Sequence, residues 1–205
     1  MNSHNLGDTS FMALKLDMSK AYDWVEWDFL EDIMQQMGFN ESWIGLILIC
    51  VKIVSYSILV NGEPKVMIHP TRGIRQGGPL SPFLFLLCIE GLLSLITNAA
   101  NFGEIKGFSL CKKGPELTHL LFANESFFCK ATTNECAKVF NILEIYELAS
   151  GHKVNRSKTT LFFSKSTLEN VCQTIKGSLG LQEITLFEKY LGLPFSIGRK
   201  EKRKL

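Results

Sequence analysis

Residues 117–131, LTHLLFANESFFCKA, place two short apolar runs on either side of the polar group Asn124, Glu125 and Ser126. Apolar and aromatic runs around an asparagine-containing polar break are typical of a tight β-hairpin. Two interpretations of the turn are open. It is either the solvated loop of an ordinary buried hairpin or a turn that carries acidic side chains to a metal site. Only the rest of the chain separates them.

The overall composition indicates a compact globular protein. The 205 residues are 46% hydrophobic and 20% charged, with a mean hydropathy of +0.11. This length suits one large domain, or one domain with an appended piece. The net charge of +2 is too small to require a nucleic-acid partner, although basic residues crowd positions 199–204. Such a run is usually a solvated tail.

The 6 cysteines form no C-x-x-C pair, and several lie within apolar runs. This usage predicts small buried hydrophobic residues in a reducing compartment, nuclear or cytoplasmic, rather than a disulfide or zinc framework. The polar opening MNSHNLGDTS does not resemble a signal peptide. The longest apolar runs, 44–60 and 83–96, are interrupted by Lys52 and Glu90. They fall short of the roughly 18 uncharged residues of a membrane span, so we expect no membrane partner.

Helical and strand patterns alternate without a regular βαβ rhythm, which predicts an α+β fold. The predicted helices cover residues 26–37, 41–54, 83–98, 133–149 and 168–179. The predicted strands cover residues 11–17, 56–60, 65–69, 105–110 and 159–164, besides the opening hairpin. Residues 61–64, NGEP, join the second and third of these strands as a hairpin. Residues 71–82, TRGIRQGGPLSP, form a glycine- and proline-rich loop before a strongly apolar helix.

Two of these segments are candidates for chemistry. Asp17 ends the first predicted strand, where a single carboxylate is usually a cap or a surface charge. Paired across a sheet with acids of the opening hairpin, it would help form an oxygen-rich site for Mg²⁺. The loop RGIRQGG adds Arg75 and Gln76 beside backbone amides, which suits phosphate or nucleotide contact. In isolation the same loop is a plain surface loop.

The order of these segments resembles the palm of reverse transcriptases, in particular those of plant LINE-type (non-LTR) retrotransposons. The blocks that carry the resemblance are LDMSKAYDWVEW (16–27), GIRQGGPLSPFLF (73–85), HLLFANESFFCKA (119–131), SGHKVNRSKT (150–159) and KYLGLP (189–194). Group II intron maturases share the palm, but SKAYDWVEW and YLGLP favour the LINE group. The resemblance implies an antiparallel sheet packed on helices, with RNA template, DNA primer and deoxynucleoside triphosphates as partners and Mg²⁺ as cofactor.

The resemblance also implies roles for individual residues. Asp17 corresponds to a metal-binding aspartate, and Tyr22 to the aromatic residue that packs under the incoming sugar and rejects a 2′-hydroxyl. Lys158 corresponds to a lysine that helps protonate the pyrophosphate leaving group. The remaining matches are Arg75, Gln76 and Gly77 beside the nucleotide and template base, and Tyr190, Leu191 and Gly192 in the primer-grip segment.

The chain departs from the family pattern at the hairpin. The family carries Ala-Asp-Asp where this chain has Ala123, Asn124 and Glu125, so a principal metal ligand is a neutral amide and Asp17 and Glu125 remain as the acidic ligands. Gly78 also stands where the family usually has Asp. The blocks begin and end close to the chain ends, so we expect a degenerate fragment with most of the fingers and the thumb missing. Its expected parts are an N-terminal remnant (1–10), a palm with partial fingers (11–194) and a basic tail (195–205).

Three functions remain open at this point. The chain is an active polymerase, a non-catalytic palm that retains weak sequence-independent nucleic-acid binding, or a translated relic without function. The loss of the second aspartate favours an inactive copy. Primer extension separates the first function from the others, and salt-dependent binding separates the second from the third.

Overall fold

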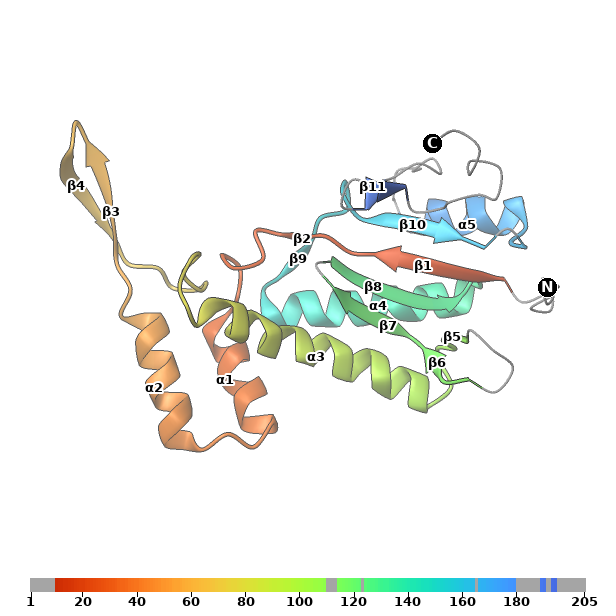
Figure 1. The fold of residues 1–205 in the computed structure, drawn as a ribbon, viewed down its shortest axis with the longest axis horizontal. Coiled ribbons are helices and arrows are strands. Elements are labelled where there is room, and N and C mark those ends of the chain that lie inside the picture. The colour runs from red at the N-terminus through yellow and green to blue at the C-terminus, as the bar shows by residue number, and fades with distance from the viewer. Residues whose placement is uncertain are drawn as a thin grey trace.

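A four-stranded antiparallel sheet lies at the centre of the computed structural model, in the strand order β10-β1-β8-β7 (Figure 1). Its strands are β1 (Phe11–Lys15), β7 (His119–Phe122), β8 (Asn124–Lys130) and β10 (Thr160–Phe163). The structure describes residues 10–109, 114–122, 124–164 and 166–179, together with the strand pairs 189–190 and 193–194. Both neighbours of β1 therefore come from the second half of the chain.

The side chains of β1 alternate between a buried face and a more exposed face. Met12 and Leu14 are buried, and so is Leu16 just after the strand, whereas the residues between them are only partly buried. Strand β8 shows the same alternation, with Phe127 and Cys129 buried. This period of two is the pattern of a sheet with one face on a core.

Helices α3 (Ser81–Asn101) and α4 (Thr133–Ser150) cover the buried face of the sheet. Thr132 caps α4 by accepting a hydrogen bond from the Glu135 amide, and Gly151 ends the helix in the left-handed conformation. Helix α3 is the one described helix that is long and apolar enough to cross a membrane. Core helices of globular proteins meet the same criteria, and the buried side of α3 packs in both cores of this chain.

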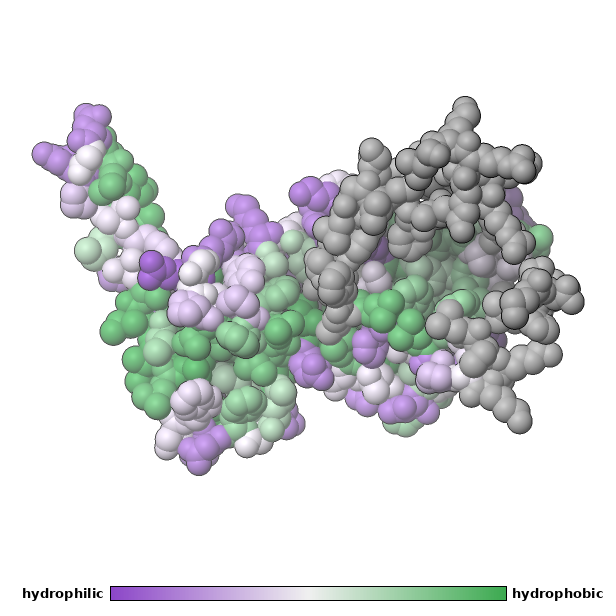
Figure 2. Space-filling view, viewed as in Figure 1, coloured by the Kyte–Doolittle hydropathy of each residue, from purple (hydrophilic) through white to green (hydrophobic). Residues whose placement is uncertain are grey.

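A second core joins α1 (Trp27–Gln36) and α2 (Glu41–Lys52) to the first half of α3. Beyond α2, strands β3 (Tyr56–Val60) and β4 (Glu63–Ile68) form a hairpin that projects from the body (Figure 1). All residues of both strands are exposed, and Figure 2 shows apolar residues along this hairpin and over α2. A two-stranded ribbon of this kind is only marginally stable in water on its own.

The remaining elements are short. Strand β2 (Met18–Ser19) pairs with β9 (Lys153–Val154), β5 (Phe108–Ser109) with β6 (Glu116–Leu117), and β11 (Lys189–Tyr190) with β12 (Leu193–Pro194). Helix α5 (Glu169–Leu179) packs against α4. The pairing of β2 with β9 was not expected from the sequence, because two-residue strands leave no periodic pattern.

The structure corrects the predicted position of the turn in the hairpin of residues 117–131, which is formed by β7 and β8. Asn124, Glu125 and Ser126 lie within β8, opposite Phe122, Leu121 and Leu120 of β7. Only residue 123 separates the two strands. Ladder hydrogen bonds join backbone groups, so the strand continues through polar residues at the end of the sheet.

Other predicted bounds shift for local reasons. The turn of the projecting hairpin has two residues, Asn61 and Gly62, both with positive φ, rather than the predicted four. Helix α3 begins at Ser81, with Pro82 in its first turn. The predicted strand 105–110 shrinks to β5.

Candidate active site

The central sheet brings two of the predicted site residues to the same end of neighbouring strands. In β1, Lys15 lies opposite Ser126 of β8 and opposite Thr160 of β10. Asp17 follows Lys15 by two residues and Asn124 precedes Ser126 by two, whereas Lys158 lies in the turn between β9 and β10. The side chains of Asn124 and Glu125 lie outside the described part of the structure.

The backbone of Asp17 is held by the segment that follows β9. Its carbonyl accepts a hydrogen bond from the Asn155 amide at 2.7 Å, and its amide lies 3.4 Å from Thr159 Oγ1. Asp17 is partly buried and Lys158 is exposed. The position of Asp17 thus depends on two residues about 140 positions away in the sequence.

Tyr22 lies in the turn of residues 20–24, directly after β2. Its ring stacks on Phe85 of α3, with centroids 5.3 Å apart and planes at 30°. Phe85 in turn makes an edge contact with the ring of His152, at 5.8 Å and 77°. The three rings form one connected cluster, with one stacked contact and one edge contact.

The glycine-rich loop is joined to the same turn through its backbone. Gly73 donates to the Val25 carbonyl at 2.7 Å, and Ile74 donates to the Tyr22 carbonyl at 2.8 Å. A Cβ on Gly73 would lie 2.8 Å from the Asp23 oxygen, and φ is +88°, so only glycine fits there. Trp27 Nε1 donates to the Gly73 carbonyl at 2.7 Å, which fixes the loop from the start of α1.

Arg75, Gln76 and Gly77 follow this anchored segment and are exposed. The carbonyl of Arg75 accepts a hydrogen bond from Ser81 Oγ at the start of α3. Arg75 and Gln76 line a cavity of about 440 Å³ between the loop and the base of the β3–β4 hairpin, where Tyr56 and Asp23 also contribute. The loop therefore presents a cation and an amide to an open cavity.

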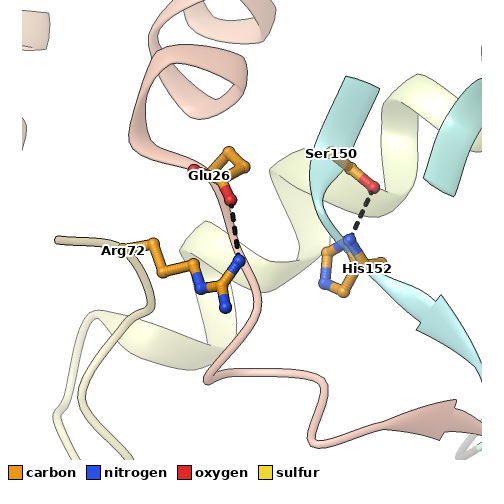
Figure 3. Close-up of polar contacts among 4 residues, drawn as sticks. All are labelled: Glu26, Arg72, Ser150 and His152. Atoms are coloured by element: carbon orange, nitrogen blue, oxygen red, sulfur yellow. Dashed lines mark hydrogen bonds and ion pairs between the residues drawn. The ribbon is translucent and has the colours of Figure 1, made fainter. Parts of the chain in front are cut away.

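Arg72 comes directly before Gly73 and lines the same cavity. Its guanidinium is 3.2 Å from Glu26 Oε1 and 4.1 Å from the centre of the Trp24 ring (Figure 3). Both charged side chains are roughly two-fifths exposed, so the ion pair itself contributes little stability. Its effect is to orient the arginine across the start of α1.

The segment from Ser150 to His152 contacts the start of α1 and the turn of residues 20–24, and Figure 3 shows the bond between Ser150 and His152. Glu26 donates its amide to the Ser150 carbonyl at 3.0 Å, and His152 donates its amide to Ser150 Oγ at 3.2 Å. The imidazole of His152 is fully buried and lies 2.9 Å from the Ala21 carbonyl. Sequence reasoning did not single out His152, because nothing in SGHKVN marks which side chain turns inward.

Burial also sets the protonation of this region. It lowers the pKa of His152, and the hydrogen bond to the Ala21 carbonyl opposes that shift. Burial raises the pKa of the nearby Cys88 thiol to about 12. Four cysteines are buried as predicted, whereas Cys50 is exposed and Cys111 lies outside the described residues.

Some predicted site residues stay untested by the geometry. Tyr190 lies in β11 with its side chain outside the described part, and Leu191 and Gly192 lie outside it altogether. Among the described residues, no three His, Cys, Asp or Glu side chains gather closely enough to hold a metal ion. The side chain of Glu125 lies outside the described part, so this statement does not include it.

Sequence comparisons connect this arrangement to known proteins. The chain matches the family described as reverse transcriptase (RNA-dependent DNA polymerase) over residues 2–195. It is 35% identical over 106 residues to an uncharacterised mitochondrial protein of Arabidopsis thaliana, covering 51% of this chain and 86% of that protein.

Two retrotransposon proteins also match. The uncharacterised 149 kDa protein of transposon TX1 from Xenopus laevis is 26% identical over 153 residues, 74% of this chain. The retrovirus-related Pol polyprotein of type-2 retrotransposable element R2DM from Drosophila melanogaster is 29% identical over 115 residues, 50% of this chain. The matched region is 11% of each of these two proteins.

The fold has a solved counterpart in apo telomerase from Candida tropicalis, truncated from its C-terminal domain. The TM-score is 0.56 at 16% identity, over 79% of this chain and 32% of that one. This likeness confirms the predicted α+β palm with its antiparallel sheet packed on helices. The family match, the retrotransposon relatives and the shared fold show that the chain belongs to the reverse transcriptase family, in the group of the non-LTR retrotransposons.

Proposed function

We propose that residues 11–194 form the palm of a reverse transcriptase, with partial fingers, whose template-directed DNA synthesis is lost in this copy through Asn124. Residues 1–10 and 195–205 are then an N-terminal remnant and a basic tail. The observation that supports the proposal is the pairing of β1 with β8, because Asp17 and Asn124 then lie near the same end of the two strands. These are the positions where the family motifs carry two metal ligands.

The side chains of Asp17, Asn124 and Glu125 suit a divalent cation, and reverse transcriptases use divalent metal ions. Asp17 and Glu125 supply carboxylates and Asn124 an amide oxygen, all hard oxygen ligands of the kind that Mg²⁺ prefers. When bound, Mg²⁺ supplies charge stabilisation for the attacking and leaving oxygens of phosphoryl transfer. Both the carbonyl and the amide of Asp17 bond to the segment of residues 155–159.

The partners proposed for the site are an RNA template, a DNA primer and deoxynucleoside triphosphates. Tyr22, supported by Phe85, is the residue that would pack under the sugar and reject a 2′-hydroxyl. Arg75, Gln76 and Gly77 are exposed on an anchored loop, where a cation and an amide suit a triphosphate and a base edge.

Two further roles complete the proposal. Lys158 is exposed in the turn that follows Asn155, the residue bonded to Asp17, and an ammonium group there can give a proton to the leaving pyrophosphate. Tyr190, Leu191 and Gly192 are proposed for the primer grip.

Asn124 is the reason for the proposed loss of activity. An amide oxygen ligates a cation but adds no negative charge against two divalent ions. If the missing charge stabilises the transition state by about 4 kcal/mol, its absence lowers the rate roughly 10³-fold.

Primer extension on a primed RNA template with Mg²⁺ or Mn²⁺ tests this proposal. The purified chain should incorporate no more deoxynucleotide than its Asp17→Ala variant. In an active non-LTR reverse transcriptase, the Asp→Asn change at the position matching Asn124 should lower kcat by about 10³. Incorporation by the unaltered chain that disappears in Asp17→Ala would overturn the loss of activity. A small effect in the active enzyme would overturn the role of Asn124.

A further inference from the structure

His152 is a fully buried polar side chain just before β9. Its ring packs against Tyr146 of the first core and against Phe85, which packs on both cores. An imidazole taken out of water destabilises the fold unless its ring nitrogens find partners. The contacts of His152 therefore indicate what its burial accomplishes.

Both ring nitrogens of His152 have partners on different elements. Nε2 lies 2.9 Å from the Ala21 carbonyl, which can only accept, so Nε2 carries the proton and donates. Nδ1 lies 3.1 Å from the hydroxyl of Tyr146, and that hydroxyl lies 3.2 Å from the Cys88 carbonyl of α3. The imidazole also stacks on the Tyr146 ring at 5.5 Å and 9°, so its orientation is fixed by α3, α4 and the turn together.

Two routes connect His152 to Tyr22. The first is the backbone, since the carbonyl that accepts from Nε2 belongs to Ala21, the residue before Tyr22. The second is the ring of Phe85, which contacts His152 on one side and Tyr22 on the other. The phenol ring of Tyr22 is thus held through its main chain and through its stacking partner at once.

The turn that His152 contacts is strained. Lys20 has φ +44°, a left-handed conformation that non-glycine residues adopt at a cost of about 1–3 kcal/mol. The Asp23 amide donates to the Lys20 carbonyl at 2.8 Å across this turn. A strained turn persists only where its surroundings support it, and the Ala21 carbonyl lies at its centre.

We propose that His152 is a positioning residue, which holds the strained turn of residues 20–24 so that Tyr22 keeps the orientation needed to select the sugar of a bound nucleotide. The selection of the sugar rests on the proposed function, whereas the support of the turn does not. The junction with α4 adds to this support at the other end, where Glu26 donates to Ser150.

Amide hydrogen exchange tests the support of the turn. His152→Leu removes the donor at similar volume, whereas His152→Gln keeps an N–H donor. Ile175→Ala in α5 serves as control, because it creates a cavity in the core without touching the turn. The two reporters are the amides of Asp23 and Ile74, which donate to Lys20 and Tyr22.

In His152→Leu, the protection of both reporter amides relative to core amides should fall about tenfold, the effect expected for one lost hydrogen bond. His152→Gln should retain most of the protection, and Ile175→Ala should leave the ratio unchanged. Equal protection in His152→Leu and the unaltered chain, or an equal loss in Ile175→Ala, would overturn the role of His152.

Nucleotide binding tests the second half of the proposal. The probes are dATP and ATP with Mg²⁺, and binding is followed by tryptophan fluorescence, because Trp24 ends the turn and Trp27 comes soon after it. The preference for dATP should fall several-fold in His152→Leu and recover in His152→Gln. An unchanged preference together with lost protection would overturn the link to sugar selection. If the unaltered chain binds neither nucleotide, the proposed function fails, while the exchange result still decides whether His152 supports the turn.

Discussion

Replacing Gly151 by alanine should destabilise the chain far more than the same change at the end of α1. Gly151 has φ +78°, and a Cβ there would lie 2.5 Å from the Trp24 carbonyl oxygen and 2.7 Å from Glu26 Cγ. Gly38 after α1 has nearly the same conformation, φ +79°, but a Cβ at Gly38 would meet no atom of another segment within 4 Å. The two glycines therefore separate conformational strain from steric overlap.

The expected magnitudes follow from these contacts. The left-handed conformation alone destabilises alanine by about 1 kcal/mol relative to glycine, which is the whole effect expected for Gly38→Ala. At Gly151 the overlap involves a backbone oxygen, and its relief opens the Glu26–Ser150 hydrogen bond. Overpacking and the lost bond add roughly 2 kcal/mol, for a total of about 3 kcal/mol.

Urea unfolding followed by circular dichroism measures the free energy of unfolding of both variants. In thermal unfolding of a chain of this length, a loss of about 3 kcal/mol lowers the Tm by roughly 9 °C and a loss of about 1 kcal/mol by roughly 3 °C. The m-values should stay equal, because both variants expose the same surface on unfolding. Equal losses of stability in Gly151→Ala and Gly38→Ala would refute the close approach of α4's end to residues 24–26.

Three further predictions concern charge, protonation and thiol reactivity. Asn124→Asp should lower the Tm in metal-free buffer, and more so at low salt, because it adds a negative charge near the proposed position of Asp17. Millimolar Mg²⁺ should restore the Tm of the variant and leave that of the unaltered chain almost unchanged. Equal responses of both forms would contradict the proposed closeness of Asn124 to Asp17. The free energy of unfolding should fall as the pH drops below about 6.5, because the lowered pKa of His152 makes the folded chain bind a proton less readily than the unfolded chain. Between pH 7.5 and 5.5, the urea midpoint of His152→Gln should therefore fall less than that of the unaltered chain. Iodoacetamide at pH 8 should alkylate the exposed Cys50 well before Cys88, because burial raises the pKa of the Cys88 thiol to about 12. Peptide mass spectrometry measures both rates, and similar rates would contradict the packing of α3.

The sequence predicts much of the fold wherever the signal is local. Helix α4 with its terminal Gly151, the existence of the β3–β4 hairpin and the two strands of the β7–β8 hairpin all follow from patterns within a few residues. These patterns succeed because caps, turns and periodic apolar faces are determined by neighbours in the chain. The predicted turn of the β7–β8 hairpin differs from the observed one because pairing with β7, and not the polarity of residues 124–126, sets where β8 begins.

The site depends on contacts that no local pattern encodes. His152 and Ala21 lie 131 positions apart, and Trp27 and Gly73 lie 46 apart. The family motifs indicate which segments meet, and the structure then shows that Asp17 is bonded through its backbone to Asn155 and Thr159. The support of the turn by a buried imidazole emerges only when the three-dimensional neighbours of the motif are known.

The topology of the central sheet also has a consequence for how the chain is made. Strand β1 is synthesised first, yet its partners β8 and β10 follow more than 100 residues later. At about 5–20 residues per second, β1 waits on the order of ten seconds for both neighbours, with its apolar face uncovered. A premature stop codon after β8 and before residue 160 would spare helices α1 to α3 but leave β1 unpaired along one edge. Shortened copies of such a gene would therefore lose the alignment at Asp17 while still producing most of the helical part of the protein.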